Sequence, residues 1–455
     1  MNARTIIVGG GISGLAAAHQ LHQQDDDFVL LEASRRLGGK IASGPVQGCD
    51  LGFDVDCAAD GFLAREPEMS DLCRELGLGG DLVSPACSGA FIWVNQALRP
   101  IPASVLGVPV DPDALLGAGI VSDPGIAELR ARGFADHKAL VGDSTVGEVV
   151  RARAGDEVFE RLVDPLLGGI NAGNADNLSI CAGAVALADA ARKGGSFLEA
   201  LRAQRNSRAS GPVFHGVKGG TQRIIEALQT ELNEQIILET PAVGLAQHGK
   251  LWRVATPTSY FEASRVIITT PSFVSAKLLE PHCREAAWML SQLPYADVAV
   301  LTFVVRREHV SHNLNGAGFL VPRDQGMLMT ACSWSSSKWA HYNDGIHAIL
   351  RVSVGRIDDR RWLNLSEPKL VATLREELAA TIGLAGPSHV RVTRWPQSLP
   401  QYFRDHLQRC DTIDTLLQRH TAGVSVSGAA LRGLGLPACV RQARQHAAQP
   451  QEANP

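Results

Sequence analysis

The stretch Thr5-Ile6-Ile7-Val8-Gly9-Gly10-Gly11-Ile12-Ser13-Gly14 decides how the start of this chain must fold. Its apolar part, Thr5 to Val8, is short, β-branched and bounded by glycine, which predicts a fully buried strand. A tight turn follows at Gly9, and Gly11 leaves room for a phosphate to approach bare backbone. Gly14 then allows the next helix to pack closely on the strand.

The residues after this loop extend the same pattern. Ile12 to Gln23 carries Ala and Leu at helical spacing, so Ile12 and Ser13 begin a helix whose free N–H groups face a pyrophosphate. A second strand, Phe28 to Leu31, ends at Glu32, and an acid there accepts hydrogen bonds from both hydroxyls of an adenosine ribose. A glycine loop alone is a weak signal. Strand, loop, helix, strand and acid in this order predict a Rossmann-like dinucleotide-binding domain rather than a mere tight turn.

Composition excludes several classes of function. A chain of 455 residues is long enough for two or three domains, and 45% hydrophobic residues with 45 glycines fit a large α/β protein. The formal net charge of −4 provides no general attraction to nucleic acid, so we expect no nucleic-acid partner. Nine cysteines without a C-x-x-C pair indicate free thiols in a reducing compartment and no metal site.

The sequence predicts a cytoplasmic protein. No stretch approaches 20 consecutive apolar residues, and the first strand begins too early for a signal peptide to precede it. One basic run has apolar residues between its charges; such a run is usually a solvated face, but it leaves peripheral membrane contact open. A homodimer also stays open. The run consists of Arg192, Lys193, Arg202, Arg205 and Arg208.

A second glycine motif follows Glu32, in Ala33-Ser34-Arg35-Arg36-Leu37-Gly38-Gly39-Lys40. Two glycines beside basic residues would place N–H groups and positive charge against a phosphate or a flavin. Together the two motifs resemble the flavin-dependent amine oxidase superfamily, whose members bind FAD. The resemblance implies FAD as the cofactor. It implies contacts from Gly9, Gly11, Ile12, Ser13, Gly14, Glu32, Ala33, Arg36, Gly38, Gly39 and Lys40, and later in the chain from Val243, Thr270, Gly428, Gly435, Leu436 and Cys439.

Five further segments resemble the porphyrinogen oxidase branch of that superfamily, the protoporphyrinogen and coproporphyrinogen oxidases. They are residues 56–78, 91–102, 164–173, 331–339 and 391–406. The resemblance implies oxidation of a porphyrinogen to a porphyrin in haem biosynthesis, with O₂ as acceptor and H₂O₂ as product. Full aromatisation removes six electrons, so FAD would be reduced and reoxidised three times. Because the chain looks soluble, we favour coproporphyrinogen III, the more polar substrate, over protoporphyrinogen IX.

The cofactor would supply the reaction itself, because the sequence contains no Ser-His-Asp order, metal-ligand spacing or paired catalytic carboxylate. We therefore name no catalytic residue. The substrate propionates need cationic partners, for which Arg65, Arg99 and Lys338 are the nearest by motif position. Gly169 lies in a break between helices that is lined by small residues, and such a break can border a cavity.

These motifs predict an α/β fold built from discontinuous segments. A Rossmann-like FAD-binding domain is expected to take residues 1–85, 210–272 and a closing segment, 419–446. A mixed-sheet substrate domain takes 86–110 and 273–418, and a helical lobe takes 111–209. Residues 447–455, rich in Gln, Ala and Pro, read as a disordered tail.

Three positions depart from the family pattern, and two other functions stay open. Ala58 and Ala90 stand where relatives carry glycine and arginine, and Ala443 or Arg444 replaces a glycine before the last helix. These departures bear on the substrate more than on the cofactor. One alternative is a flavin oxidase of an amine or a secondary-metabolite intermediate, which 5% aromatic residues disfavour because amine oxidases need an aromatic cage. The other alternative is a non-catalytic FAD-binding protein.

Overall fold

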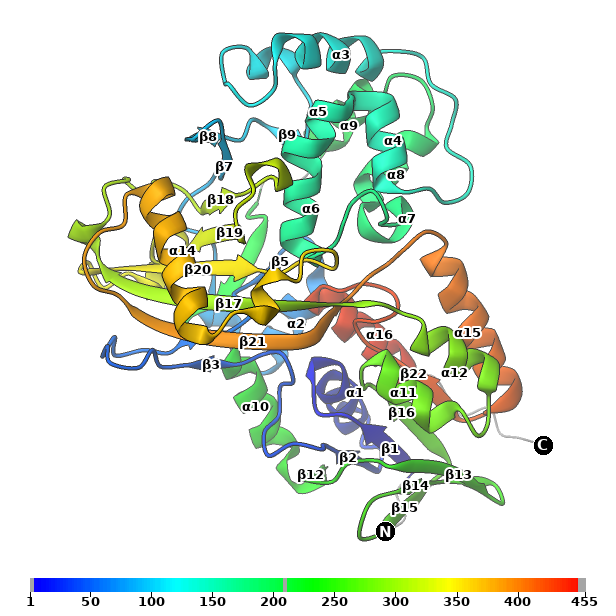
Figure 1. Cartoon of the computed structure of the whole chain (residues 1–455). Coiled ribbons are helices and arrows are strands. Elements are labelled where there is room, and N and C mark those ends of the chain that lie inside the picture. The colour runs from blue at the N-terminus through cyan, green and yellow to red at the C-terminus, as the bar shows by residue number, and fades with distance from the viewer. Residues whose placement is uncertain (1–3, 208–210, 449–455) are drawn as a thin grey trace.

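A five-stranded parallel sheet gathers strands from three distant parts of the chain (Figure 1). The computed structural model describes residues 4–207 and 211–448. All neighbouring strands of this sheet pair in parallel, so every connection crosses over through other elements. In sheet order the strands are β12 (Ile236–Ile237), β2 (Phe28–Leu31), β1 (Thr5–Val8), β16 (Arg265–Ile268) and β22 (Val424–Val426).

Both faces of the parallel sheet are buried, because side chains alternate along β1. Ile7 belongs to a core formed with α1 (Ile12–Gln23), α2 (Pro67–Glu75), α10 (Gln222–Leu232) and α16 (Leu436–Ala448). Ile6 and Val8 enter the opposite core. That core is completed by β13 (Gly244–His248), β14 (Leu251–Ala255), β15 (Tyr260–Ala263), α11 (Ser272–Leu279), α12 (Arg284–Ser291) and α15 (His406–His420).

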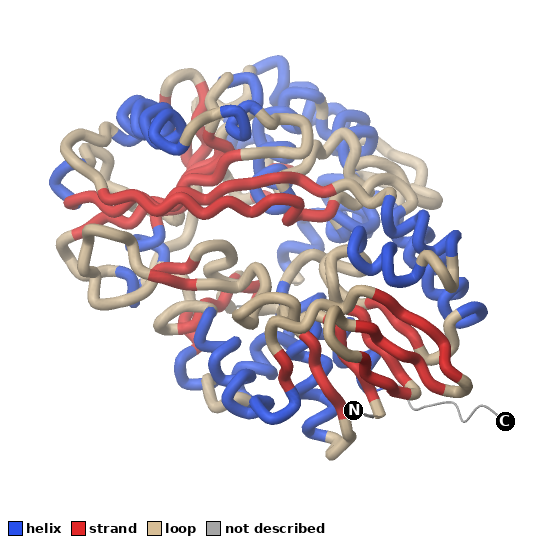
Figure 2. Tube along the Cα trace, turned by 60° about the horizontal axis from the view of Figure 1, so that its bottom comes forward, coloured by secondary structure: helices blue, strands red, loops and turns tan. Residues whose placement is uncertain are grey.

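A seven-stranded mixed sheet forms the second layer, and Figure 2 shows its long strands standing apart from the strands of the parallel sheet. Only β18 and β7 pair in parallel; its other strand pairs are antiparallel. Helix α14 (Glu367–Ile382) packs on the sheet through Leu370, Leu374 and Leu378. In sheet order the strands are β21 (His389–Pro400), β17 (Tyr295–Arg306), β20 (His347–Val354), β19 (Met329–Trp334), β18 (Gly318–Leu320), β7 (Phe91–Val94) and β8 (Ala97–Pro100).

A helical lobe stands at the top of Figure 1 and has its own hydrophobic core. Helices α5 (Asp156–Val158) and α6 (Asp164–Asn171) are joined by a π-helical turn, Phe159–Val163, so one helical rod points toward the mixed sheet. The lobe also contains α3 (Asp123–Gly133), α4 (Val146–Ala154), α7 (Ile180–Gly183), α8 (Val185–Arg192) and α9 (Phe197–Asn206).

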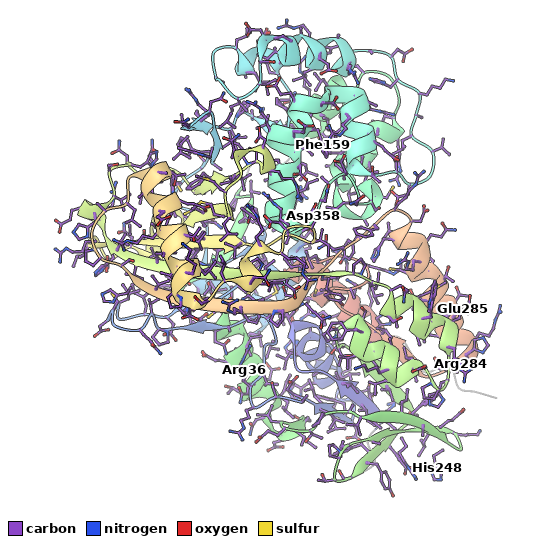
Figure 3. All side chains as sticks on the ribbon, viewed as in Figure 1. Arg36, Phe159, His248, Arg284, Glu285 and Asp358 are labelled. Atoms are coloured by element: carbon purple, nitrogen blue, oxygen red, sulfur yellow. The ribbon has the colours of Figure 1, made fainter. Side chains whose placement is uncertain are left out.

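One arginine fastens the lobe to the mixed sheet. The guanidinium of Arg323 donates to Asp164 Oδ2 and to Asp358 Oδ1, both at 2.7 Å. Asn174 donates to the other oxygen of Asp358, which lies beside the lower end of α6 in Figure 3. The ion pair of Arg323 with buried Asp164 at the start of α6, and the bond from Asn174 just beyond its end, therefore hold α6 over the sheet.

Short elements link these layers. They are β3 (Ser43–Gly44) with β4 (Val55–Asp56), β9 (Ser104–Val105) with β10 (Val108–Pro109), the three-stranded set β5 (Phe62–Leu63), β11 (Phe214–Val217) and β6 (Leu82–Val83), and α13 (Ser335–Lys338). Helix α16 continues to Ala448, so two residues of the predicted tail, 447 and 448, are helical, and residues 449–455 lie outside the described part.

The expected fold class, a Rossmann-like α/β fold with a mixed sheet and a helical lobe, is confirmed. The exact domain boundaries stay predictions. In residues 4–207 and 211–448, no helix combines the length and the apolar character needed to cross a bilayer. The same residues contain no group of three or more His, Cys, Asp or Glu side chains that could hold a metal ion.

Candidate functional site

The first glycine loop has three close-packed glycines, Gly9, Gly10 and Gly14, and one, Gly11, that faces open space. Gly9 has φ +109°, a conformation that favours glycine, and a Cβ on Gly14 would lie 1.8 Å from the Gly9 carbonyl oxygen. A Cβ on Gly11 would meet no atom within 4 Å. Gly9 and Gly14 therefore serve packing of α1 on β1, whereas Gly11 borders a space at the helix N-terminus that suits a pyrophosphate.

The second glycine stretch lies directly against the first. The N–H of Gly38 donates to the Gly10 carbonyl at 2.8 Å, and a Cβ on Gly39 would lie 3.3 Å from the Gly11 Cα. Gly38 has φ +96°. Bare backbone from both stretches thus forms one cradle at the start of α1.

Glu32 is held beside this cradle. Its two carboxylate oxygens accept the N–H groups of Gly10 at 2.6 Å and Ser34 at 2.7 Å. Each oxygen keeps a second lone pair, so the carboxylate can still accept hydrogen bonds from ribose hydroxyls. Ala33, which follows, is exposed. The Arg36 guanidinium donates to the carbonyls of Leu37, Ile41 and Gly39, so Arg36, labelled in Figure 3, stabilises its own loop.

The end of the chain returns to the same place. Gly428 has φ +127°, and a Cβ there would lie 3.6 Å from Ser13 Oγ. Helix α16 begins at Leu436, directly after Gly435, and packs along α1. Cys439 in its first turn is buried, and burial raises the pKa of its thiol to about 11, against a smaller opposite effect of Ser13. The N-terminus of α1, the loop at Gly428 and the first turn of α16 thus border one site.

Lys40 lies where this site meets the mixed sheet. Its ammonium donates to the Ser398 carbonyl near the end of β21, and Nζ lies 5.9 Å from the centre of the Tyr295 ring at the start of β17. The residue as a whole is exposed. The protein around its ammonium nevertheless lowers the pKa of Lys40 to about 8 through desolvation, which the nearby Cys439 partly opposes. An anionic ligand beside Lys40 would stabilise the ammonium form.

This shift predicts how cofactor binding depends on pH. Binding of an anionic dinucleotide favours protonated Lys40. Above the pKa of about 8 in the free protein, Lys40 must therefore take up a proton when the dinucleotide binds. We expect the Kd for FAD to rise above that pH by up to about tenfold per pH unit. Calorimetric titration of apoprotein between about pH 7 and about pH 9 measures it, and Lys40→Met should remove the dependence. A wild-type Kd that does not change with pH would contradict this role.

Two predicted cofactor residues lie beside the cradle rather than in its backbone. The N–H of Val243 donates to the Ala255 carbonyl at 2.8 Å, so this N–H is already used, and contact of Val243 with adenine stays a prediction. The Thr270 hydroxyl is paired with Ser275 Oγ at 2.9 Å. Its neighbour Thr269, which the motifs did not identify, donates to the carbonyls of Val8 and Gly9. Thr269 therefore braces the first glycine loop.

A buried carboxylate, Asp56, begins the segment 56–78, but the sequence assigned it no role in the site. It is 1% exposed and accepts hydrogen bonds from Ser43 Oγ at 2.7 Å, from the Thr221 N–H and hydroxyl at 2.9 and 2.7 Å, and from the Tyr342 hydroxyl at 2.8 Å. Burial, followed by the nearby Asp56 charge, raises the pKa of Tyr342, so that its hydroxyl stays a donor. Asp56 thus joins the two halves of the cofactor side to the mixed sheet.

Lys338 belongs to a charged cluster at the mixed sheet. Lys338 Nζ lies 3.1 Å from Asp60 Oδ1, and Arg351 NH1 lies 2.9 Å from Asp60 Oδ2. Burial opposes the Asp60 charge, but these two cations hold the pKa of Asp60 well below its ordinary value. Two cations and one carboxylate leave one positive charge in excess. The Lys338 ammonium also lies 5.6 Å from the centre of the Phe214 ring, and Phe214 is 39% exposed.

Arg65 lies two residues after Leu63, which pairs with Phe214, whereas Arg99 lies far from the cluster. Arg65 is exposed and follows Ala64, whose N–H donates to the Val213 carbonyl, next to Phe214. Arg99 is on β8, four strands from the strand β20 that carries Arg351, or roughly 19 Å at the usual strand spacing. A Cβ on Gly119 would lie 3.3 Å from the Arg99 guanidinium carbon, so Arg99 packs against the helical lobe.

The exposed end of α6 lies against the mixed sheet at β18. Gly169 is exposed there, and its Cβ would lie 3.2 Å from a methyl group of Leu320 in β18. The next residue, Ile170, is 53% exposed, which is unusual for a large apolar side chain and which the motifs did not identify. Gly169 and Ile170 thus present small and apolar surface beside the sheet.

The positions that depart from the family pattern have ordinary structural surroundings. The Ala58 carbonyl accepts a hydrogen bond from Arg351, and the Ala90 carbonyl accepts one from the Ile101 N–H. Ala443 is fully buried in the core that α16 shares with α1, and Arg444 is paired with Glu75. The structure therefore gives each of these residues a hydrogen bond, an ion pair or a buried packing position.

The basic run of the helical lobe is partly paired. The Arg192 guanidinium donates to Cys181 Sγ at 3.0 Å, and Arg202 Nε donates to the Val110 carbonyl at 2.6 Å. Arg208 lies outside the described residues. Acidic side chains outnumber basic ones over residues 111–207. The lobe as a whole therefore carries no net positive charge that would attract an anionic membrane.

Comparison with known proteins agrees with this geometry. A family model described as flavin containing amine oxidoreductase matches residues 12–449. The chain is 31% identical to the coproporphyrinogen III oxidase of Mycobacterium tuberculosis over 95% of this chain and 94% of that protein. It is 29% identical to the enzyme of the same name from Bacillus subtilis, over 96% of both chains.

A solved structure extends the similarity to three dimensions. The crystal structure of a protein from Exiguobacterium sp. 255-15, named as a candidate protoporphyrinogen oxidase, superposes with a TM-score of 0.87 at 31% identity, over 98% of both chains. The resemblance predicted from the two glycine motifs is confirmed by these matches, as is FAD as the cofactor of this enzyme. The chain therefore belongs to the flavin-containing amine oxidoreductase family.

Proposed function

We propose that this enzyme oxidises a porphyrinogen to the porphyrin, in haem biosynthesis, and that coproporphyrinogen III is preferred to protoporphyrinogen IX. The observation that carries the proposal is the excess positive charge of the Asp60, Lys338 and Arg351 cluster beside the exposed Phe214 ring. A flat macrocycle with carboxylate side chains needs such a combination of apolar surface and cations. The names of the full-length relatives support the same substrate class.

The chain's own residues would hold the substrate in a fixed position against the cofactor. Lys338 and Arg65 would meet propionates at one rim of the cleft, while Gly169 and Ile170 at the end of α6 would cover an apolar face of the ring. Asp60 keeps Lys338 and Arg351 at fixed positions through its two oxygens. We place no protein group in the proton transfer itself.

Bound FAD supplies the two-electron acceptor for this chemistry. The conversion of a porphyrinogen to a porphyrin removes six electrons and six protons in total. Three O₂ molecules take them up and leave as three H₂O₂, so the reaction balances without a further co-substrate. We assign this enzyme to the cytoplasm; contact with a membrane surface and formation of a homodimer stay untested.

Aerobic turnover tests the proposal. The purified flavoprotein is incubated with coproporphyrinogen III or protoporphyrinogen IX, and porphyrin fluorescence and H₂O₂ are followed together. We expect three H₂O₂ per porphyrin and faster turnover of coproporphyrinogen III. Faster turnover of protoporphyrinogen IX would reverse the order of the substrates. If neither compound reduces the flavin under anaerobic conditions, the enzyme acts on another substrate class, such as an amine.

Removal of one cation should weaken substrate binding specifically. Lys338→Met converts the cluster from one excess positive charge to a neutral pair of Asp60 and Arg351. We expect the KM for coproporphyrinogen III to rise about tenfold with flavin content unchanged, the scale for loss of one charged hydrogen bond. Arg99→Met is the matched control, since Arg99 packs against the helical lobe, and its KM should stay within about twofold. Equal KM values for both variants would exclude the cluster as the carboxylate site.

A further inference from the structure

The connector between β21 and α15, residues 401–405, contacts two different parts of the protein together with His406, the first residue of α15. Gln401, Phe403 and Asp405 meet the helical lobe, whereas Tyr402 and His406 direct their side chains to the closing loop, residues 427–435. In Figure 1 the connector runs between the lobe and α16. The connector is irregular rather than extended: Arg404 and Asp405 form a turn, and Asp405 has φ +63°. Its residues can therefore face two neighbours at once.

The contacts with the helical lobe are polar and mostly made by backbone. The Gln401 side chain donates from Nε2 to the carbonyl of Asn171, the last residue of α6, at 2.8 Å. The Ser179 N–H donates to the Tyr402 carbonyl at 2.7 Å. The Asp405 N–H donates to Asp143 Oδ2 at 2.8 Å, and Asp143 also accepts from Ser179 Oγ. The connector is thus tied to the same end of α6 that carries Gly169 and Ile170.

The contacts with the closing loop are made by two buried side chains. The Tyr402 hydroxyl donates to the Ala429 carbonyl at 2.5 Å, and His406 Nε2 donates to the Leu431 carbonyl at 2.6 Å. The two rings stack with centres 4.1 Å apart and planes at 21°. Burial lowers the pKa of His406 to about 4, so the ring is neutral and its Nε2 carries the proton that the carbonyl accepts.

These bonds matter because the closing loop has no regular structure of its own. It begins beside Ser13 at Gly428 and ends at Gly435, where α16 starts. Tyr402 and His406 are 6% and 1% exposed, so water cannot replace either bond. The carbonyls of Ala429 and Leu431 would lose a donor if either side chain were removed, and the loop would then shift relative to the start of α1.

From this arrangement we infer that Tyr402 and His406 are positioning residues for FAD, and that Gln401 couples the same connector to the substrate-facing end of α6. The inference rests on the proposed function, because it takes the closing loop as part of the FAD site. It deepens that function by naming the element that sets the distance between cofactor and substrate. None of the three residues is placed in contact with the reacting atoms.

Single-bond variants test the inference. Tyr402→Phe removes only the hydroxyl, and we expect the Kd for FAD, measured by titration of apoprotein, to rise about tenfold. The visible spectrum and midpoint potential of the bound flavin should change as well, which a loss of stability alone would not produce. His406→Leu should behave like Tyr402→Phe, and His406→Gln should restore the wild-type values, because a glutamine amide N–H can replace Nε2. Gln401→Met should raise the KM for coproporphyrinogen III several-fold with the Kd for FAD within about twofold.

Trp252→Phe is the matched control. Trp252 is 3% exposed and donates from its indole N–H to the Ala422 carbonyl at 2.8 Å, an equally buried bond outside the closing loop. It should lower the melting temperature without changing flavin affinity or potential. The inference is overturned if Trp252→Phe changes them as much as Tyr402→Phe does, or if Tyr402→Phe leaves them unchanged. A wild-type chain that takes up no FAD would instead overturn the proposed function, and this inference with it.

Discussion

A Gly11→Ala variant is expected to fold normally and yet to purify almost free of flavin. Gly11 has φ −74°, which alanine adopts without strain, and a Cβ there would meet no protein atom within 4 Å. The methyl group would instead enter the space at the N-terminus of α1 that suits the FAD pyrophosphate. Overpacking of one carbon usually costs about 1–3 kcal/mol, so the Kd for FAD should rise about 10- to 100-fold.

The measurement compares two glycines of the same loop. Flavin content and the Kd for FAD are determined for Gly11→Ala, together with the melting temperature of its apoprotein, which should equal that of wild-type apoprotein. Gly14→Ala is the contrasting variant, since its Cβ would lie 1.8 Å from the Gly9 carbonyl oxygen and must displace backbone. It should therefore reduce stability of the apoprotein itself. Full flavin content in Gly11→Ala would show that the cofactor does not approach this backbone.

Asp56→Ala should destabilise the folded protein far more than a substitution that removes one hydrogen bond. The buried carboxylate accepts hydrogen bonds from Ser43, from two donors of Thr221 and from Tyr342. Its removal leaves these four donors without their acceptor in a site that is 1% exposed. Several lost bonds to one charge predict a decrease of about 3–5 kcal/mol in the free energy of unfolding, measured on the apoprotein by urea denaturation.

Two further variants separate this effect from a general one. Tyr342→Phe removes a single donor and should decrease the free energy of unfolding by about 1–2 kcal/mol. Asp54→Ala changes an exposed carboxylate two residues away, and its effect should stay within about 0.5 kcal/mol. If Asp56→Ala decreased the free energy of unfolding no more than Asp54→Ala, the hydrogen bonds of Asp56 would not hold these segments together as the structure indicates.

Much of the cofactor side could be predicted because its signals are local. The strand Thr5–Val8, the helix Ile12–Gln23 and the strand Phe28–Leu31 match the expected bounds, since apolar periodicity and glycine placement act over a few residues. Both glycine stretches were identified from the sequence, but their direct contact with each other was found only in the structure.

The substrate side was predicted less completely. Motif position selected Arg99 and Lys338 equally, but only Lys338 lies in a charged cluster with Asp60 and Arg351. Arg351 was not identified, because one arginine within the strand His347–Val354 carries no local signal. Thr269 was missed for a similar reason, since its role depends on β16 lying beside β1.

Local sequence was sufficient to predict the Rossmann-like start of the cofactor side and the position of the first glycine loop, because both depend on residues within about forty positions of one another. The family resemblance added FAD as the cofactor. Which distant groups meet depends on the tertiary structure. Asp56 reaches Thr221 and Tyr342 across 165 and 286 positions, and Tyr402 reaches the closing loop only after β21 has crossed to the cofactor side. Such pairs follow from strand order and packing. Whether two distant residues meet depends on how whole elements are arranged, and no local pattern of residues encodes that arrangement.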